Sequence, residues 1–161
     1  MITPCCGWLC ATGRRPTTTS RRRWPPCAGR RSDPVDVVAA IFIDGEQVLA
    51  CRRRAGLEAG GRWEFPGGKT ERWEEPETAL EREIDEELGV EVEVGELLDR
   101  STTMVAGTPI TLACYFVRTL GEAPAQSTDH DQIGWFARDR LGWLDWADPD
   151  LPAVRRLVAA T

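Results

Sequence analysis

Residues 68–90 read GKTERWEEPETALEREIDEELGV, and this stretch decides the fold. In its second half, apolar residues recur at three- and four-residue intervals: Ala79, Leu80, Ile84 and Leu88. That period is typical of one apolar stripe on a helix, which we expect over residues 76–88. Pro76 suits the first helical turn, where its missing N–H costs nothing, and Gly89 suits a left-handed stop. The stretch therefore predicts a helix with one buried face.

Three carboxylates stand beside this stripe. Glu83, Glu86 and Glu87 are spaced i, i+3 and i+4, so they emerge on one face of the helix. Like charges at this spacing destabilise a helix by about 0.2–0.5 kcal/mol per pair. A solvated acidic face is the ordinary explanation of such a cluster. A divalent cation is the alternative, because hard cations take oxygen ligands and bridge carboxylates to phosphates.

The preceding letters, GGKT at residues 67–70, suggest a P-loop but do not form one. A P-loop requires a glycine five residues before its Gly-Lys pair, so that backbone N–H groups can surround the phosphates. Trp63 occupies that position, and the nearest upstream glycines are out of register. We therefore assign no phosphate role to Lys69 or Thr70.

The same stretch satisfies every fixed position of the pattern G-x5-E-x7-R-E-U-x-E-E-x-G-U, in which U is a bulky aliphatic residue. The matching residues are Gly68, Glu74, Arg82, Glu83, Ile84, Glu86, Glu87, Gly89 and Val90. In this signature the chain resembles the Nudix hydrolases, and the resemblance extends over about residues 35–158. It implies an α/β protein with the Nudix fold, a mixed β-sheet sandwiched between α-helices.

The rest of the body agrees with such a sheet. Alternation and β-branched residues predict strands at 35–43, 47–53, 63–65, 90–94, 97–105, 110–119 and 132–136. A second amphipathic helix is expected over residues 151–160. Strands with helices at the middle and the end indicate a mixed sheet covered by helices.

Charge divides the chain of 161 residues at about residue 33. The first 33 residues are rich in arginine and lack apolar periodicity, so we expect a disordered or non-native leader ahead of one Nudix domain over 34–161. The net charge is −6 despite this basic leader, and so acidic a body disfavours duplex nucleic acid as a partner. No apolar run is long enough to span a membrane. The body has two cysteines, Cys51 and Cys114, and no disulfide framework, which favours a cytoplasmic location.

The resemblance to Nudix hydrolases implies a site for Mg²⁺, with Mn²⁺ as an alternative. Its ligands would be the backbone carbonyl of Gly67 and the carboxylates of Glu83, Glu86 and Glu87. Glu74 and Arg82 match a structural salt bridge of the family, which fixes geometry more than it adds stability. The general base is either Glu83 or an acid on a later loop.

The later loop reads STDHDQIGW over residues 127–135. Alignment on Trp135 places Asp129 where MutT-like members carry a glutamate, and Asp131 is the neighbouring choice. His130 lies between them, and we treat it as an ion-paired residue of a surface loop rather than as a base.

The residues 63–71, WEFPGGKTE, resemble the MutT branch most. Members of that branch cleave nucleoside triphosphates to the monophosphate and pyrophosphate, often to remove 8-oxo-dGTP in nucleotide-pool sanitation, a form of DNA repair. By this resemblance Arg52 or Arg53 would contact phosphate, although three consecutive arginines at a strand end can also be simply solvated. The partner is then a small nucleotide, bound by a monomer or a homodimer.

Asp150 lies where 8-oxo-guanine enzymes carry an asparagine. An ionised aspartate only accepts hydrogen bonds, which suits the amine of cytosine, so CTP and 5-methyl-dCTP are alternative substrates. A protonated Asp150 could still serve guanine. Trp143 and Trp146 are candidates for a pocket wall. A non-catalytic Nudix nucleotide sensor and an enzyme acting on ADP-ribose or a dinucleotide are the other hypotheses.

Overall fold

The structure of the chain is a computed structural model that describes residues 33–56 and 60–160. The basic leader expected over residues 1–33 lies outside the described residues, apart from Asp33. Within the described part, no helix is both long and apolar enough to cross a membrane.

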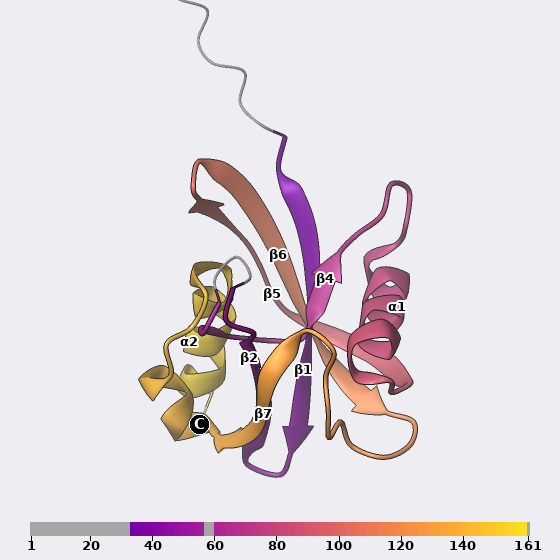
Figure 1. The fold of residues 1–161 in the computed structure, drawn as a ribbon, viewed down its shortest axis with the longest axis vertical. Helices are drawn as coiled ribbons and strands as arrows, with labels where there is room; N and C mark the ends of the chain where they lie inside the picture. Colours follow the sequence, from indigo (N-terminus) through magenta and orange to yellow (C-terminus); the bar gives the residue numbers. More distant parts are fainter. Residues whose placement is uncertain (1–32, 57–59, 161) are drawn as a thin grey trace, which may run out of the picture. The chain divides into compact units, whose positions relative to one another are not determined.

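Four strands precede the first α-helix, and three more strands lie between it and the C-terminal α-helix (Figure 1). The strands are β1 (Val35–Asp44), β2 (Gln47–Arg53), β3 (Trp63–Glu64), β4 (Gly67–Lys69), β5 (Val92–Val105), β6 (Thr108–Thr119) and β7 (His130–Ala137). The α-helices are α1 (Pro76–Leu88) and α2 (Leu151–Ala159), and the 3-10 helices are η1 (Arg138–Trp143) and η2 (Asp148–Asp150).

Strand β1 is at the centre of a mixed sheet. It runs parallel to β6 and antiparallel to both β2 and β4. Strand β4 pairs with β1 over residues 37–39, whereas β2 pairs with it only at residues 43–44, so β1 is shared between two neighbours on the same side. Strand β5 adds to β6, while β3 and β7 add to β2. The sheet therefore divides on one side of β1.

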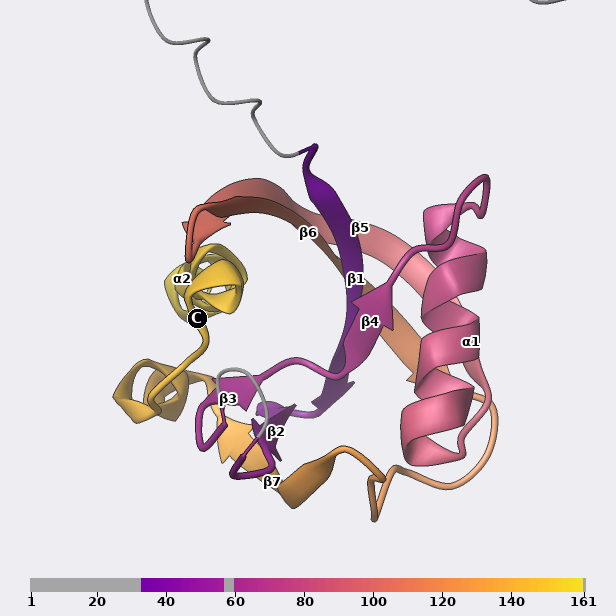
Figure 2. The same cartoon turned by 45° about the horizontal axis from the view of Figure 1, so that its top comes forward.

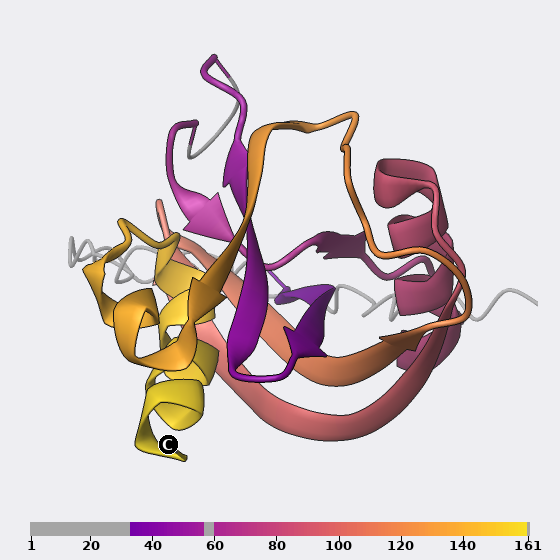
Figure 3. The ribbon, with the colours of Figure 1, turned by 90° about the horizontal axis from the view of Figure 1, so that it is seen from below.

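The two α-helices cover opposite faces of this sheet (Figure 2). Alternate residues of β1 enter two separate cores: Val38 and Ala40 pack with Leu80 of α1, and Ile41 packs with Leu157 of α2. Figure 3 shows the long β5–β6 pair extending from the α2 side to the α1 side. The mixed sheet between helices that we expected from the sequence is confirmed.

Helix α1 has the bounds and the buried face that its sequence predicts. Its buried residues are Ala79, Leu80, Ile84 and Leu88. Gly89 ends it at a φ of 67°, in the left-handed region, and donates its N–H to the carbonyl of Asp85 at 2.9 Å. The acidic residues beside this stripe are therefore carried on a helix whose buried face packs against the sheet.

Strands β4, β5 and β7 differ most from the sequence expectation. Strand β4 was not predicted, because a Pro-Gly-Gly run normally ends a strand, yet Gly67 and Gly68 pair with β1. Strand β5 is one strand rather than two, since register shifts between Val94 and Asp99 absorb the irregular residues without ending the pairing to β6. Strand β7 begins at His130 rather than at residue 132.

We expect truncation of the α1 stripe to be costly. Leu80 is fully buried, so Leu80→Ala should lower the free energy of unfolding by about 2–5 kcal/mol, measured by urea denaturation. Leu120→Ala is the matched control, since Leu120 is 55% exposed and should change stability by less than about 0.5 kcal/mol. Similar losses in both variants would show that α1 does not anchor this core.

Candidate active site

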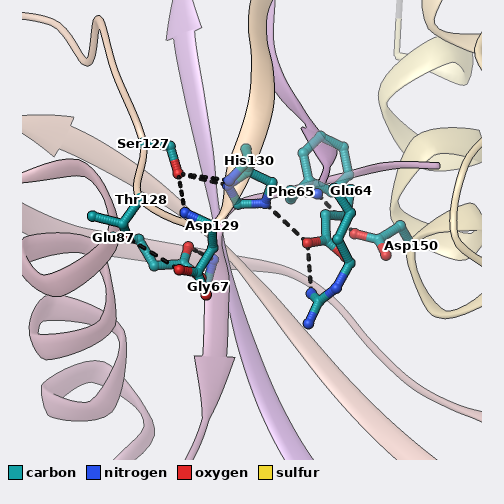
Figure 4. A network of polar contacts seen from close by, with 10 residues as sticks. Glu64, Phe65, Gly67, Glu87, Ser127, Thr128, Asp129, His130 and Asp150 are labelled. Atoms are coloured by element: carbon teal, nitrogen blue, oxygen red, sulfur yellow. Dashed lines mark hydrogen bonds and ion pairs between the residues drawn. The ribbon is translucent and has the colours of Figure 1, made fainter. Parts of the chain in front are cut away.

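A pocket of about 490 Å³ opens where β1, β4, α1, η2 and the segment before β7 converge. Its lining includes acidic side chains from three of these segments and from β3: Glu64, Glu83, Glu87, Asp129 and Asp150. Figure 4 shows Glu87 and Asp129 beside Gly67, with Asp150 well separated from them and Glu64 between. The pocket is therefore acidic along its length, with two distinct ends.

The three carboxylates predicted as metal ligands are not placed alike. Glu83 and Glu87 line the pocket, whereas Glu86 does not. The side chain of Glu86 is 61% exposed and lies 3.6 Å from the Arg82 guanidinium, one helical turn away. A helical spacing of i, i+3 and i+4 brings residues to one face, but the rim of the pocket passes between Glu86 and the other two.

Two glycines let the strand β4 approach α1 closely. The Gly67 N–H donates to a carboxylate oxygen of Glu87 at 3.2 Å. A Cβ on Gly68 would lie 2.0 Å from Oε2 of Glu83, and one on Gly67 would lie 2.1 Å from the carbonyl oxygen of Val38. No other residue type fits at these two positions without moving the backbone or the carboxylates. The turn and the acidic face of the helix are consequently built as one unit.

Arg82 holds the acidic helix to the loop before it. Its guanidinium donates to both oxygens of Glu74, at 3.0 and 2.9 Å, so the expected salt bridge is bidentate. It also donates to Oε1 of Glu83 at 2.7 Å. The hydrogen bonds from Arg82 lower the pKa of Glu74. Arg82 thus offsets part of the like-charge repulsion that the sequence predicts for this face.

The donor set at the α1 end fits a hard divalent cation. Among the described residues, no three Asp, Glu, His or Cys side chains stand close enough together to form a ready metal site. Glu83 and Glu87 nevertheless present carboxylate oxygens to one pocket, and the missing side chain at Gly68 leaves Glu83 room there. Oxygen ligands from carboxylates are what Mg²⁺ and Mn²⁺ prefer.

Glu87 is the most perturbed of these carboxylates. Burial raises its pKa to about 7, and the negative charges of Asp129 and Glu64 act in the same direction. His130 and the Gly67 N–H oppose the shift. A carboxylate that ionises only near neutrality indicates a place where a bound cation would be favourable.

The later loop separates its two candidate bases. Asp129 lines the pocket, whereas Asp131 forms an ion pair with Arg52 at 2.8 Å at the surface. The hydrogen bond from Arg52 lowers the pKa of Asp131, which weakens it as a base. The two arginines divide in the same way, because Arg53 lines the pocket and Arg52 does not.

His130 is not the surface residue that we expected. It is 5% exposed, since strand β7 begins there and turns its side chain inward. Its Nε2 lies 2.9 Å from Glu64 and its Nδ1 lies 2.8 Å from Oγ of Ser127. The local sequence, with an aspartate on each side, concealed this burial because polar neighbours are typical of an exposed loop.

Asp150 forms the other end of the pocket. Its side chain is buried and accepts the Phe65 N–H at 3.0 Å. Burial raises the pKa of Asp150 to about 8, which favours its protonated form. The candidate wall residues Trp143 and Trp146 are elsewhere: Trp143 is 75% exposed, and Trp146 is buried and donates its Nε1–H to the carbonyl of Leu141 at 2.7 Å.

The sequence that forms this site matches a known protein family. The family model named NUDIX domain matches residues 33–158. The chain is a Nudix hydrolase. Enzymes of this family are pyrophosphohydrolases that require divalent metal ions and act on small nucleotide substrates.

Relatives of this Nudix hydrolase include MutT proteins. A Mycobacterium tuberculosis protein named "Putative 8-oxo-dGTP diphosphatase 2" is 40% identical over 116 residues, which cover 71% of this chain and 81% of the relative. The solution structure of the E. coli ORF135 protein is 31% identical, with a TM-score of 0.65, over 78% of this chain and 89% of that one. The solution structure of the MutT protein from methicillin-resistant Staphylococcus aureus 252 is 30% identical, with a TM-score of 0.66, over 80% of this chain and 98% of that one.

The sequence did not identify Glu64 as a pocket residue of this Nudix hydrolase. Glu64 lies in the two-residue strand β3, lines the pocket and accepts a hydrogen bond from Nη1 of Arg53 at 2.8 Å. The signal available was a lone acid between Trp63 and Phe65, both of which pack into the core. Alternation in so short a strand does not tell which side faces a ligand.

The raised pKa of Glu87 predicts a pH-dependent stability without metal. The folded protein keeps this proton up to about pH 7, whereas the unfolded chain releases it near 4.5. Between these values the folded state binds more protons, so the free energy of unfolding falls as pH rises, by on the order of 3 kcal/mol.

Glu87→Gln should remove this slope, measured by urea unfolding between pH 4.5 and 8 in a metal-free buffer. Asp150 contributes equally to both proteins and cancels in the comparison. Parallel pH profiles for the two proteins would contradict the burial of an ionisable Glu87.

Proposed function

We propose that this Nudix hydrolase is a Mg²⁺-dependent nucleoside triphosphate pyrophosphohydrolase, which converts a triphosphate and water to the monophosphate and pyrophosphate. We propose 8-oxo-dGTP as its substrate, in nucleotide-pool sanitation. The mycobacterial relative and the MutT proteins support this assignment. Cys51 and Cys114 are free and buried, as expected for an enzyme of the reducing cytoplasm.

The observation that carries the proposal is the two-ended pocket. At one end Glu83, Glu87 and Asp129 supply negative charge for cations that accompany phosphates. At the other end, a buried carboxyl group on Asp150 lies beside the Phe65 backbone, away from those charges. Phosphates suit the first end and a nucleobase suits the second. A ligand that bridges both is a nucleotide.

Glu83 and Glu87 would hold the cation, together with the Gly67 carbonyl and with Glu86 where its side chain can turn from Arg82. Bound Mg²⁺ would lower the charge that the phosphates present to an attacking water. Arg53 would add a fixed positive charge beside the phosphates, since it lines the same pocket. The chain's own task is then to orient the phosphate chain and to accept a proton.

We propose Asp129 as the general base that accepts this proton. It faces the pocket near Glu87, whereas Asp131 is engaged by Arg52 at the surface. Glu83 is the alternative base, although Arg82 donates a hydrogen bond to it at 2.7 Å. As water attacks phosphorus, its proton passes to the Asp129 carboxylate and the bridging P–O bond breaks to release pyrophosphate.

A comparison of two aspartates tests this role. Asp129→Asn should reduce kcat for pyrophosphate release by about 10²- to 10⁴-fold, the usual contribution of a general base. Asp131→Asn, two residues away and outside the pocket, should remain within about threefold of wild type. A small effect at Asp129 together with a large loss in Glu83→Gln would transfer the role to Glu83.

The nucleobase end favours an oxidised guanine. Asparagine donates and accepts, and a protonated carboxyl group does the same, whereas an ionised carboxylate only accepts. With its pKa raised to about 8 by burial, Asp150 has a hydrogen to donate at neutral pH. Oδ1 is occupied by the Phe65 N–H, so the other oxygen can carry that hydrogen. An ionised Asp150 would only accept, as the amine of cytosine requires.

Substrate choice can be measured by pyrophosphate release from 8-oxo-dGTP, dGTP, CTP, dCTP and 5-methyl-dCTP. We expect 8-oxo-dGTP to be preferred, and Asp150→Asn to keep kcat/KM for it within about threefold, because the amide retains a donor and an acceptor. If the variant instead loses roughly tenfold or more on cytosine nucleotides that the wild type prefers, the enzyme is a cytosine triphosphatase. Hydrolysis of ADP-ribose without hydrolysis of triphosphates would overturn the proposed function.

A further inference from the structure

His130 is buried behind the pocket without lining it. Its side chain is 1% exposed, and it connects two residues that come from different segments of the chain. Nε2 lies 2.9 Å from Oε1 of Glu64, and Nδ1 lies 2.8 Å from Oγ of Ser127 (Figure 4). A buried imidazole with both nitrogens engaged is fixed in orientation.

The contact to Glu64 continues to the pocket. The same oxygen, Oε1 of Glu64, accepts the hydrogen bond from Nη1 of Arg53 at 2.8 Å. Arg53 and Glu64 line the pocket, and Arg53 is also paired with His130 in the ladder between β2 and β7. The ladder shifts register between Arg52 and Arg53, so these backbone contacts are irregular at this point. The hydrogen bond to Glu64 is the side-chain contact that orients the guanidinium.

The hydrogen-bond partners also determine the tautomer of His130. Glu64 accepts from Arg53, so its carboxylate offers no hydrogen and Nε2 is the donor to it. Ser127 Oγ accepts the N–H groups of Asp129 and His130, each at 3.3 Å, which leaves the hydroxyl hydrogen for Nδ1. Both the neutral Nε2–H tautomer and the imidazolium carry the hydrogen on Nε2 that Glu64 accepts, so either form supports Glu64.

The other side of His130 stabilises the loop that carries Asp129. Ser127 Oγ receives both the imidazole contact and the Asp129 N–H. The neighbouring Thr128 N–H donates to the carbonyl of Glu87 at 3.0 Å, next to the last turn of α1. One buried side chain therefore contacts the supports of two pocket residues, Arg53 and Asp129.

We propose that His130 is a positioning residue, which orients Arg53 through Glu64 and Asp129 through Ser127 for hydrolysis of the triphosphate. This inference rests on the proposed function. An ordinary buried histidine would stabilise the fold and nothing more. The two roles differ because positioning through Glu64 depends on one ring nitrogen, whereas packing depends on the whole ring.

Two amide substitutions separate the two nitrogens. Glutamine places its amide near Nε2, so His130→Gln keeps a donor for Glu64, and asparagine places its amide near Nδ1, so His130→Asn keeps only the Ser127 side. We expect His130→Asn to raise KM for 8-oxo-dGTP about tenfold, and His130→Gln to restore it to within about threefold of wild type. Steady-state pyrophosphate release gives KM and kcat, and thermal unfolding is measured on every variant.

A double-mutant cycle tests the connection to Arg53. In an Arg53→Ala background, His130→Asn should raise KM by less than about twofold, because the guanidinium it would misplace is gone. Ser127→Ala removes a contact without a large change in packing, so it remains informative if His130→Asn fails to fold. It should lower kcat through Asp129 while KM stays within about twofold.

Equal KM values in the two His130 variants, or full additivity with Arg53→Ala, would overturn the positioning role. Equal losses of thermal stability with unchanged KM would show that His130 is structural only. If the wild type cleaves no nucleoside triphosphate, the proposed function fails, and this inference fails with it. If the wild type does cleave a nucleoside triphosphate, then equal KM values, full additivity or an unchanged KM overturns the positioning role of His130 and leaves the proposed function intact.

Discussion

The structure depends on the close contact between strand β4 and the acidic face of helix α1. A Cβ at Gly68 would lie 2.0 Å from the Glu83 carboxylate, and one at Gly67 would meet the backbone of β1. Because β4 pairs directly with β1, this contact fixes α1 against the central strand of the sheet. Because Gly67 and Gly68 have no side chains, the backbone of β4 and the carboxylates of α1 can form one wall of the pocket.

Concentrating carboxylates at that wall has an electrostatic cost, which the chain limits in two ways. Arg82 binds Glu74 with two hydrogen bonds and Glu83 with a third, so one guanidinium balances two acids. Within the described part of the chain no guanidinium pairs with Glu87, and burial raises its pKa to about 7. A bound divalent cation would relieve the remaining repulsion between these carboxylates. Such a cation is also what the hydrolysis of phosphate anhydrides uses.

The pocket also places two aspartates, Asp129 and Asp150, in different surroundings. Asp129 is on an exposed loop beside the phosphate end, while Asp150 is buried against the Phe65 backbone. The same side chain is therefore a candidate base in one place and a candidate nucleobase contact in the other. Between them, the buried side chain of His130 connects Glu64 of the pocket to Ser127, on the loop that carries Asp129.

Much of this was determined by the sequence alone. The period of the apolar residues predicted α1 to the residue, and the spacing of Glu83, Glu86 and Glu87 placed them on one face, since helical geometry is local. The tertiary structure decided what local rules cannot: that Gly67 and Gly68 form a strand, that Glu86 and Asp131 lie outside the pocket, and that His130 is buried. Each of these depends on segments distant in the chain meeting at one place, and polar residues near a turn look the same in sequence whether they face solvent or a neighbouring strand.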